Sequence, residues 1–347
     1  ESNTMHTTID VHLKNKVTNI LNKHSMQLKS KAIHNASAIV IDVKTGEVIS
    51  YVGNVKYKGN NHQNEVDMIR AKRSTGSILK PFLYAEMLHK GLILPQTLIR
   101  DVPVDYFGYK PRNYDLSYDG VVPADEVVSR SLNVPSVNML NAYGVNPFLS
   151  KLKSYGFTSI DQSGNHYGLS LILGGAEVTS WDLAKVYAGM VQQLMNKEQL
   201  ITLSANDTLR TIVDYPDKAA IWHTLEAMLN VTRPNEDKAW KAFANTNKVA
   251  WKTGTSFGGR DAWSVGCTPD YVVVVWAGNA NGQGRPNLTG VGCAAPILFD
   301  IFNVLPLRSE WFQYPKENSC SVQVCSKSGM KANSCCLDKK TCNVPEN

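Results

Sequence analysis

Apolar and polar residues alternate with different periods along the chain, and each period predicts a different element. Residues 11–34 carry apolar side chains at helical spacing, with lysine and asparagine between them, which predicts an amphipathic helix. Residues 38–43 and 47–53 are β-branched runs on either side of Lys44-Thr45-Gly46. Two such runs around a glycine turn predict a β-hairpin.

The middle of the chain is predicted to be mainly helical. Residues 78–91 have the pattern of a helix, whereas residues 95–125 are rich in Pro, Gly, Tyr and Asp and are expected to form a long loop. Several helices are expected within residues 126–195, most clearly over 179–195, and another over 217–232.

Strand character returns in the last third of the chain, at residues 249–255, 262–265 and 271–277. A Gly- and Asn-rich loop is expected over 278–292 and a final helix over 294–304. Strands near both ends of a chain can join one sheet. The predicted fold class is therefore α+β, with an antiparallel sheet of N- and C-terminal strands flanked by helices and a helical middle subdomain.

The same pattern divides the chain into three parts. We expect an N-terminal helical linker over residues 1–34, a main domain over 35–308, and a linker followed by the Cys-rich start of a C-terminal domain over 309–347. No run approaches the roughly 18 apolar residues of a membrane span. The chain begins with Glu1 and carries no signal peptide, so membrane attachment is expected only through N-terminal residues outside it.

Composition and charge exclude some classes of function. The chain is 43% hydrophobic and 19% charged, as in an ordinary globular protein, and its net charge is +6. No basic run is interleaved with aromatic residues, so nucleic-acid binding is not expected. The histidines form no metal-binding pattern such as His-Glu-x-x-His, and we expect neither a metal nor another cofactor.

The chain has seven cysteines, five of them near its end. The tail has no histidine and no paired Cys-x-x-Cys units, which favours disulfides, and an oxidising compartment, over a zinc site. An odd number leaves at least one thiol free or paired between chains. Cys267 and Cys293 could pair if their Cα atoms are close enough. The five tail cysteines are Cys320, Cys325, Cys335, Cys336 and Cys342.

Three short patterns carry the candidate chemistry: Ser77-Ile78-Leu79-Lys80, Ser131-Leu132-Asn133 and Lys252-Thr253-Gly254-Thr255. Each is common by chance, and Ser-x-x-Lys also occurs at Ser150 and Ser328. Ser77 follows a Thr-Gly pair and is expected to open the 78–91 helix, which would place Lys80 on the same helix face, within reach of its hydroxyl.

In this order, the three patterns resemble the signature of the serine β-lactamase and D,D-peptidase superfamily. The surrounding segments are similar to the transpeptidase domain of class A penicillin-binding proteins, especially the type 1C branch. No segment resembles the glycosyltransferase domain of that family. The segments that carry the resemblance are residues 74–84, 131–137, 173–179, 252–263 and 324–329.

The resemblance implies a D,D-transpeptidase that cross-links peptidoglycan stems through an acyl-enzyme on Ser77. Lys80 would be the base, with its pKa lowered by burial and by Lys252. Ser131, held by both lysines, would relay a proton to the leaving amine, and Asn133 would orient Lys80 and hold the substrate amide.

The third pattern would bind the substrate. Thr253, Thr255 and the charge of Lys252 would hold the terminal carboxylate, and the strand edge would pair with the substrate backbone. Gly254 would let the substrate approach closely. The N–H groups of Ser77 and Thr255 would form the oxyanion hole.

The expected partners are D-Ala-D-Ala stem peptides, β-lactams and other proteins of cell-wall synthesis, in the periplasm at the outer face of the cytoplasmic membrane. Two other hypotheses remain open. One is a β-lactamase or a β-lactam sensor, and the other is a non-catalytic scaffold module of the same machinery. The lifetime of a penicillin adduct would discriminate among them.

Overall fold

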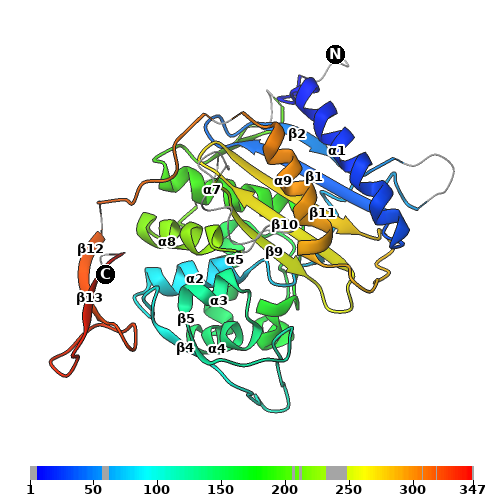
Figure 1. The fold of residues 1–347 in the computed structure, drawn as a ribbon. Coiled ribbons are helices and arrows are strands. Elements are labelled where there is room, and N and C mark those ends of the chain that lie inside the picture. The colour runs from blue at the N-terminus through cyan, green and yellow to red at the C-terminus, as the bar shows by residue number, and fades with distance from the viewer. Residues whose placement is uncertain are drawn as a thin grey trace.

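The computed structural model describes residues 6–56, 62–204, 208–210, 213–231, 248–306, 308–317 and 319–345. The centre of the fold is a five-stranded antiparallel sheet in the order β2-β1-β11-β10-β9 (Figure 1). Strands from both ends of the chain form it, which confirms the predicted fold class. The strands are β1 (Asn35–Asp42), β2 (Val48–Val52), β9 (Ala250–Thr255), β10 (Asp261–Cys267) and β11 (Tyr271–Gly278).

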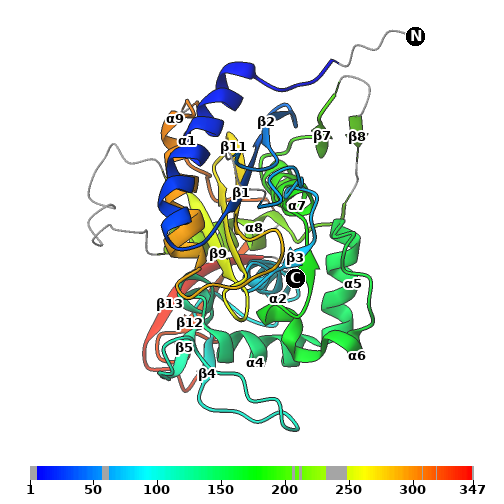
Figure 2. The ribbon, with the colours of Figure 1, turned by 90° about the vertical axis from the view of Figure 1, so that its right-hand side faces the viewer.

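Helices cover both faces of the sheet (Figure 2). One face is packed by α1 (Val11–Ser30) and α9 (Ala295–Val304), and the other by α7 (Ser180–Leu194) and α8 (Lys218–Leu229). Successive side chains of a strand point to opposite faces. The central strands β1, β10 and β11 are therefore buried along their whole length, because each face contributes to its own hydrophobic core.

The N-terminal helix α1 confirms the predicted amphipathic pattern. The side chain of Asp10 caps it by accepting the N–H of Leu13 at 3.0 Å, and its apolar stripe, including Val17 and Leu21, is buried against the sheet. The helix ends at Ser30, and the next residues lead into β1. The predicted division at residues 1–34, 35–308 and 309–347 remains a prediction, although α1 contributes to the core like α9.

The predicted helical middle is present. It contains α2 (Lys80–His89), α3 (Ala124–Ser129), α4 (Asn133–Tyr143), α5 (Val145–Tyr155), α6 (Gly164–Tyr167) and the 3₁₀ helix η1 (Gly168–Leu173). Two short strands, β3 (Arg73–Ser74) and β6 (Glu177–Val178), pair beside it.

The prediction of one long loop over residues 95–125 was wrong at its ends. β4 (Leu98–Asp101) and β5 (Gly120–Pro123) form an antiparallel pair, and only the residues between them form a loop. Short apolar pairs, Leu98-Ile99 and Val121-Val122, supply the strand character. Two smaller elements were also not predicted: the pair of β7 (Leu200–Thr202) with β8 (Thr208–Arg210), and the π turn η3 (Gly290–Ala294) within the expected loop.

The C-terminal tail is a hairpin of β12 (Ser319–Cys325) and β13 (Lys339–Pro345), seen beside α8 in Figure 1. It is docked on the domain: the N–H of Leu98 donates to the carbonyl of Ser328 at 3.2 Å, and His223 Nε2 donates to the carbonyl of Asn343 at 2.7 Å. Gly329 has a φ of +67°, and an added Cβ would lie 1.5 Å from the carbonyl oxygen of Gln96. A glycine is therefore needed where the hairpin meets the domain.

All seven cysteines are unpaired thiols in the structure, so the expected disulfides are not confirmed. Cys267 is buried in the core on the α7 side of the sheet, and Cys293 is buried in the core on the α9 side. The sheet separates the two side chains, which excludes the pairing considered for them. Among the described helices, none has both the length and the apolar character that crossing a membrane requires.

Candidate active site

The first pattern lies in a turn that directly precedes α2. The sequence predicted that Ser77 opens the helix, but residues 76–79 form a turn and the helix begins at Lys80. The N–H of Lys80 donates to the carbonyl of Ser77 at 3.3 Å, and Pro81 follows within the first helical turn, where its missing N–H is tolerated. Ser77 is therefore held by a tight turn, and it is half-buried.

The segment 74–79, which ends in this turn, rests on the third pattern. Gly76 has a φ of +51°, and a Cβ on it would lie 2.5 to 2.7 Å from backbone atoms of Thr255. A Cβ on Gly254 would lie 2.6 Å from the carbonyl oxygen of Thr75. Two glycines, one on each side of the contact, thus allow the backbones to touch. The space that a side chain on Gly254 would need is filled by the turn that carries Ser77, and the close approach of substrate at Gly254 stays a prediction.

Hydrogen bonds from other elements fix the same turn. Trp263 Nε1 donates to the carbonyl of Ser74 at 2.7 Å, and the N–H of Thr75 donates to the carbonyl of Ala176 at 3.0 Å. Ser74 Oγ donates to the carbonyl of Gly174 at 2.8 Å. The segment 173–179, which sequence analysis had noted only for its resemblance, therefore supports the nucleophile.

Lys80 is buried, with 2% of its surface exposed, and is directed at the second pattern. Its Nζ donates to the carbonyls of Ser131 at 2.7 Å and Leu132 at 3.0 Å, and to Asn133 Oδ1 at 2.8 Å. In the described chain none of the hydrogen bonds of Lys80 Nζ goes to Ser77. Burial, and then the nearby charge of Lys252, lower the pKa of Lys80 well below its ordinary value.

Ser131 connects the two lysines. Lys252 Nζ donates to its hydroxyl at 2.7 Å and Lys80 Nζ donates to its carbonyl, so both lysines hold Ser131, as the sequence predicted. Ser131 has a φ of +57°, which is unusual for a residue with a side chain. Such strain costs on the order of 1–3 kcal/mol and persists only where the surroundings enforce it.

Lys252 lies on β9, which pairs only with β10 among the described strands and is therefore an edge strand of the sheet. It is 1% exposed, and burial lowers the pKa of Lys252 to about 7. Its second hydrogen bond, at 2.8 Å, goes to the carbonyl of Thr253. Both buried lysines donate to uncharged groups, so among the described residues no acidic partner offsets the effect of burial on their pKa.

The two threonines of the third pattern are half-buried on the same strand. Thr255 Oγ1 accepts the N–H of Gly290 at 2.9 Å, which leaves its hydroxyl hydrogen as a donor. The structure thus brings together all the residues that sequence analysis selected: Ser77, Lys80, Ser131, Asn133, Lys252, Thr253, Gly254 and Thr255.

Sequence analysis missed Asn113. It lies between β4 and β5, and its Oδ1 accepts the N–H groups of Asn133 and Val134 at 3.0 and 3.1 Å. An asparagine in a polar loop gives no signal for such a contact, because its partners are 20 and 21 residues away in sequence.

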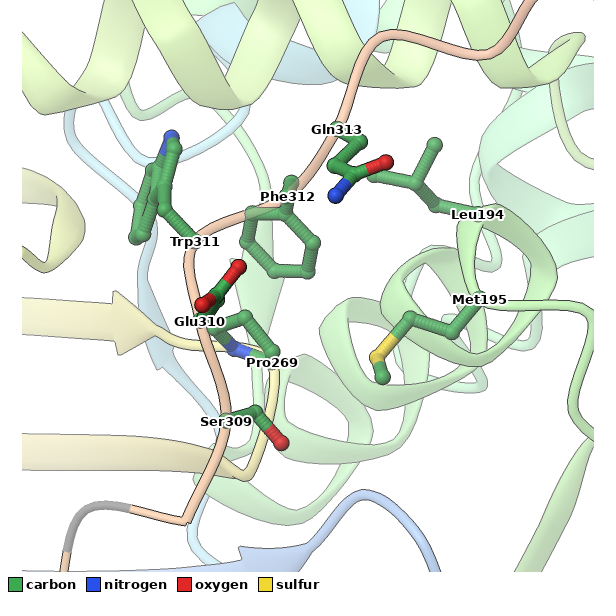
Figure 3. A pocket seen from close by; sticks show the side chains of 8 residues that line it. All are labelled: Leu194, Met195, Pro269, Ser309, Glu310, Trp311, Phe312 and Gln313. Carbon is green, nitrogen blue, oxygen red and sulfur yellow. The ribbon is translucent and has the colours of Figure 1, made fainter.

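A cavity of about 240 Å³ lies elsewhere in the molecule, between the end of α7, Pro269 and the chain that follows α9 (Figure 3). Figure 3 shows Phe312 on that chain toward Leu194 and Met195, whereas Trp311 projects to the opposite side. None of the lining residues belongs to the three patterns, and the cavity has only one ionisable side chain, Glu310. It is a packing gap under the connection to the C-terminal hairpin.

The family described as penicillin binding protein transpeptidase domain matches residues 36–303. Penicillin-binding protein 1C of Escherichia coli is 33% identical over 311 residues, which are 89% of this chain and 39% of the relative. Penicillin-binding protein 1B of Haemophilus influenzae is 29% identical, over 80% of this chain and 37% of the relative. The chain therefore spans well under half the length of these two relatives.

Solved structures show the same fold. Penicillin-binding protein 1A from Haemophilus influenzae has a TM-score of 0.74 at 14% identity, covering 97% of this chain and 71% of that one. The PonA1 protein from Mycobacterium tuberculosis, in complex with penicillin V, has a TM-score of 0.70 at 21% identity, covering 90% and 89%. Together with the family match and the convergence of the three patterns, these similarities show that the chain belongs to the penicillin-binding protein transpeptidase domain family.

Proposed function

We propose that this domain is a serine D,D-transpeptidase that cross-links peptidoglycan through an acyl-enzyme on Ser77. One observation carries the proposal: Ser131 is held between two buried lysines of lowered pKa, beside the turn that presents Ser77. A serine hydroxyl needs a neighbouring base to become a nucleophile, and a lysine of lowered pKa can provide one.

In the first step, neutral Lys80 takes the proton of Ser77 Oγ. The three acceptors around Lys80 Nζ match the three N–H groups of an ammonium, so they stabilise the form that Lys80 adopts after taking the proton. Ser77 Oγ attacks the carbonyl carbon between the two D-alanines of a stem peptide and forms a tetrahedral intermediate.

The third pattern positions the substrate. Edge strand β9 offers backbone groups to an extended peptide, and Lys252 with the hydroxyls of Thr253 and Thr255 binds the terminal carboxylate. In the described chain the N–H of Ser77 has no backbone partner, and together with the N–H of Thr255 it would stabilise the oxyanion.

In the second half of the reaction, Ser131 passes its proton to the leaving nitrogen and takes another from Lys252, whose Nζ donates to its hydroxyl, and the terminal D-alanine departs. An amine of a second stem attacks the acyl-enzyme and gives up a proton through Ser131 to Lys252, an amide bond forms, and Lys80 returns to Ser77 the proton that it took in the first step. A β-lactam amide imitates the cleaved bond and would acylate Ser77; PonA1, which shares the fold, is described in complex with penicillin V. Because the substrate is peptidoglycan, the domain would act in the periplasm, with other cell-wall synthesis proteins as partners.

Incubation with a fluorescent penicillin, with Ser77→Ala as the control, tests this proposal. We expect one adduct per chain that is absent from the variant and decays over many minutes. Release within seconds would instead indicate a β-lactamase. If the folded protein forms no adduct and also fails to release D-alanine from a stem peptide, a scaffold module is the better description.

A further inference from the structure

Asn113 uses every hydrogen-bonding position of its side chain. Its Oδ1 accepts the N–H groups of Asn133 and Val134, and its Nδ2 donates to Asp101 Oδ1 at 2.7 Å and to the carbonyl of Ser117 at 2.9 Å. Only 2% of Asn113 and 1% of Asp101 are exposed. A buried amide with four partners has a single orientation, and it imposes that orientation on the groups it contacts.

These contacts replace a missing helix cap. The first N–H groups of a helix have no partner within it, and a side chain at the N-cap normally accepts one of them. The N-cap of α4 is Leu132, which cannot do so. Asn113 supplies the acceptor from another segment, and it does so at Asn133, whose own side chain binds Lys80.

The same contacts bear on the strained Ser131. Lys80 holds the carbonyls of Ser131 and Leu132 from one side, and Asn113 holds the two residues that follow from the other. Asn133 Nδ2 also donates to the carbonyl of Arg112, next to Asn113, at 2.9 Å. The left-handed backbone of Ser131 is therefore fixed between two sets of hydrogen bonds.

We propose that Asn113, anchored by Asp101, is a positioning residue for the acylation of Ser77. It has no contact with the reacting atoms; it keeps Asn133 and Ser131 where Lys80 and Lys252 can use them. The inference rests on the proposed function for its catalytic part, whereas its structural part stands on the hydrogen bonds alone.

The chain offers a matched control in Asn138. Asn138 Nδ2 donates to the carbonyl of Arg100 at 2.8 Å, and its Oδ1 accepts the hydroxyl of Tyr106 at 2.5 Å. It thus ties the same loop to the same helix, but it contacts none of the residues 131–134 through these bonds. Removing Asn138 weakens the attachment of the loop and spares the contacts made by Asn113.

The test compares Asn113→Ala with Asn138→Ala in a saturation experiment with fluorescent penicillin, which separates the acylation rate constant from the dissociation constant of the initial complex. A misplacement of about 1 Å costs on the order of 100-fold in rate. We expect Asn113→Ala to lower the rate constant about 30- to 100-fold with the dissociation constant changed less than about threefold, and Asn138→Ala to change both less than about threefold. Equal losses in both variants would overturn the proposal.

Hydrogen–deuterium exchange of the segment 131–137 gives a readout that does not depend on activity. We expect Asn113→Ala to speed the exchange of the Asn133 and Val134 amides at least tenfold, and Asn138→Ala to leave it unchanged. If the parent protein forms no penicillin adduct, the proposed function fails. The exchange rates of the Asn133 and Val134 amides still show in that case whether Asn113 fixes the position of the second pattern. Unchanged exchange in Asn113→Ala would refute that role.

If Asn113→Ala does not fold, Asp101→Ala replaces it. That variant removes the anchor of Asn113 and leaves its bonds to the two amides, so a loss of about tenfold in the acylation rate constant is expected. A rate constant equal to that of Asn138→Ala would count against the proposal.

Discussion

The amino groups of Lys80 and Lys252 bind opposite ends of one residue, Ser131. Lys80 Nζ donates to its carbonyl and Lys252 Nζ to its hydroxyl, each at 2.7 Å. Both amines are buried, and burial lowers the pKa of each. Because the residue that joins them has a strained backbone, a change at one lysine should affect the other through Ser131.

Replacement of Lys80 by methionine should nearly abolish acylation of Ser77. Methionine fills the buried volume but cannot accept a proton, and loss of a general base costs about 10²- to 10⁴-fold in rate. The rate constant for penicillin adduct formation is the quantity to measure. Lys72→Met, at an exposed lysine near the same turn, is the control and should react at the parental rate. A Lys80→Met protein that retains a tenth of the parental rate would show that another group is the base.

The buried Lys252 should make stability depend on pH. The pKa of Lys252 is about 7 in the folded protein, whereas the ordinary pKa of a lysine, which we take for the unfolded chain, is 10.5. At a pH between these two values, the unfolded chain keeps a proton that the folded chain has lost. Where the unfolded state binds more protons, stability rises with pH. The free energy of unfolding of the parent, relative to Lys252→Met, should therefore rise from pH 7 to pH 10 by up to about 1.4 kcal/mol per pH unit.

Urea denaturation of both proteins at several pH values in that window measures this difference. Taking the difference removes titrations that the two proteins share. Parallel stability curves would mean that the folded protein keeps Lys252 charged at pH 10.

An alanine at position 254 should slow acylation without unfolding the domain. Its Cβ would meet the carbonyl oxygen of Thr75 at 2.6 Å, so the turn carrying Ser77 and strand β9 must move apart. Displacement of this size should lower the acylation rate constant about 10- to 100-fold. Gly292→Ala is a suitable comparison, since its Cβ would meet only the hydroxyl of Thr289, at 3.0 Å. Similar rates in both alanine variants would argue that the contact is looser in solution.

A buried carboxylate outside the reaction should matter for stability alone. Glu86, on α2, accepts the hydroxyls of Tyr143 at 2.5 Å and of Tyr155, and Lys151 lies 3.7 Å away. Burial and Glu86 raise the pKa of both tyrosines, so they remain donors. Glu86→Leu leaves two buried hydroxyls without an acceptor and should lower the free energy of unfolding by about 2–6 kcal/mol, at about 1–3 kcal/mol each.

Two further substitutions at the same site should restore stability to the Glu86→Leu variant. Adding Tyr143→Phe and Tyr155→Phe to Glu86→Leu removes the unpaired hydroxyls, so much of the lost stability should return. Chemical denaturation followed by tryptophan fluorescence measures both steps. A triple variant no more stable than Glu86→Leu would place the loss in packing and not in the hydrogen bonds.

The sequence was enough to predict the sheet and the residues that meet at the candidate active site. Strand β11 is an almost wholly apolar run and β1 has an apolar centre, Ala38 to Ile41, while the residues within each motif are separated by short, fixed intervals. Both signals are local. The start of α2 was misplaced by two residues, because a tight turn ahead of Pro81 has the same polarity as a first helical turn.

Long-range contacts could not be predicted in this way. The role of Gly254 depends on Thr75, and that of Asn113 depends on Asn133, and in neither pair does sequence distance reveal the contact. The left-handed backbone of Ser131 is likewise imposed by its surroundings, since serine has no preference for it. Contacts between backbone groups that are distant in sequence change neither the composition of the chain nor its pattern of apolar and polar residues.

The docking of the terminal hairpin has a practical consequence for cutting the chain. A recombinant fragment ending at residue 303, where the family match stops, would lack the Ser328 carbonyl and expose the amide of Leu98 to solvent. Leu98 begins β4, and that strand ends at the Asp101 that anchors Asn113. Removal of the hairpin would therefore weaken a series of contacts that runs from Leu98 along β4 to Asp101 and Asn113, and from Asn113 to the candidate active site.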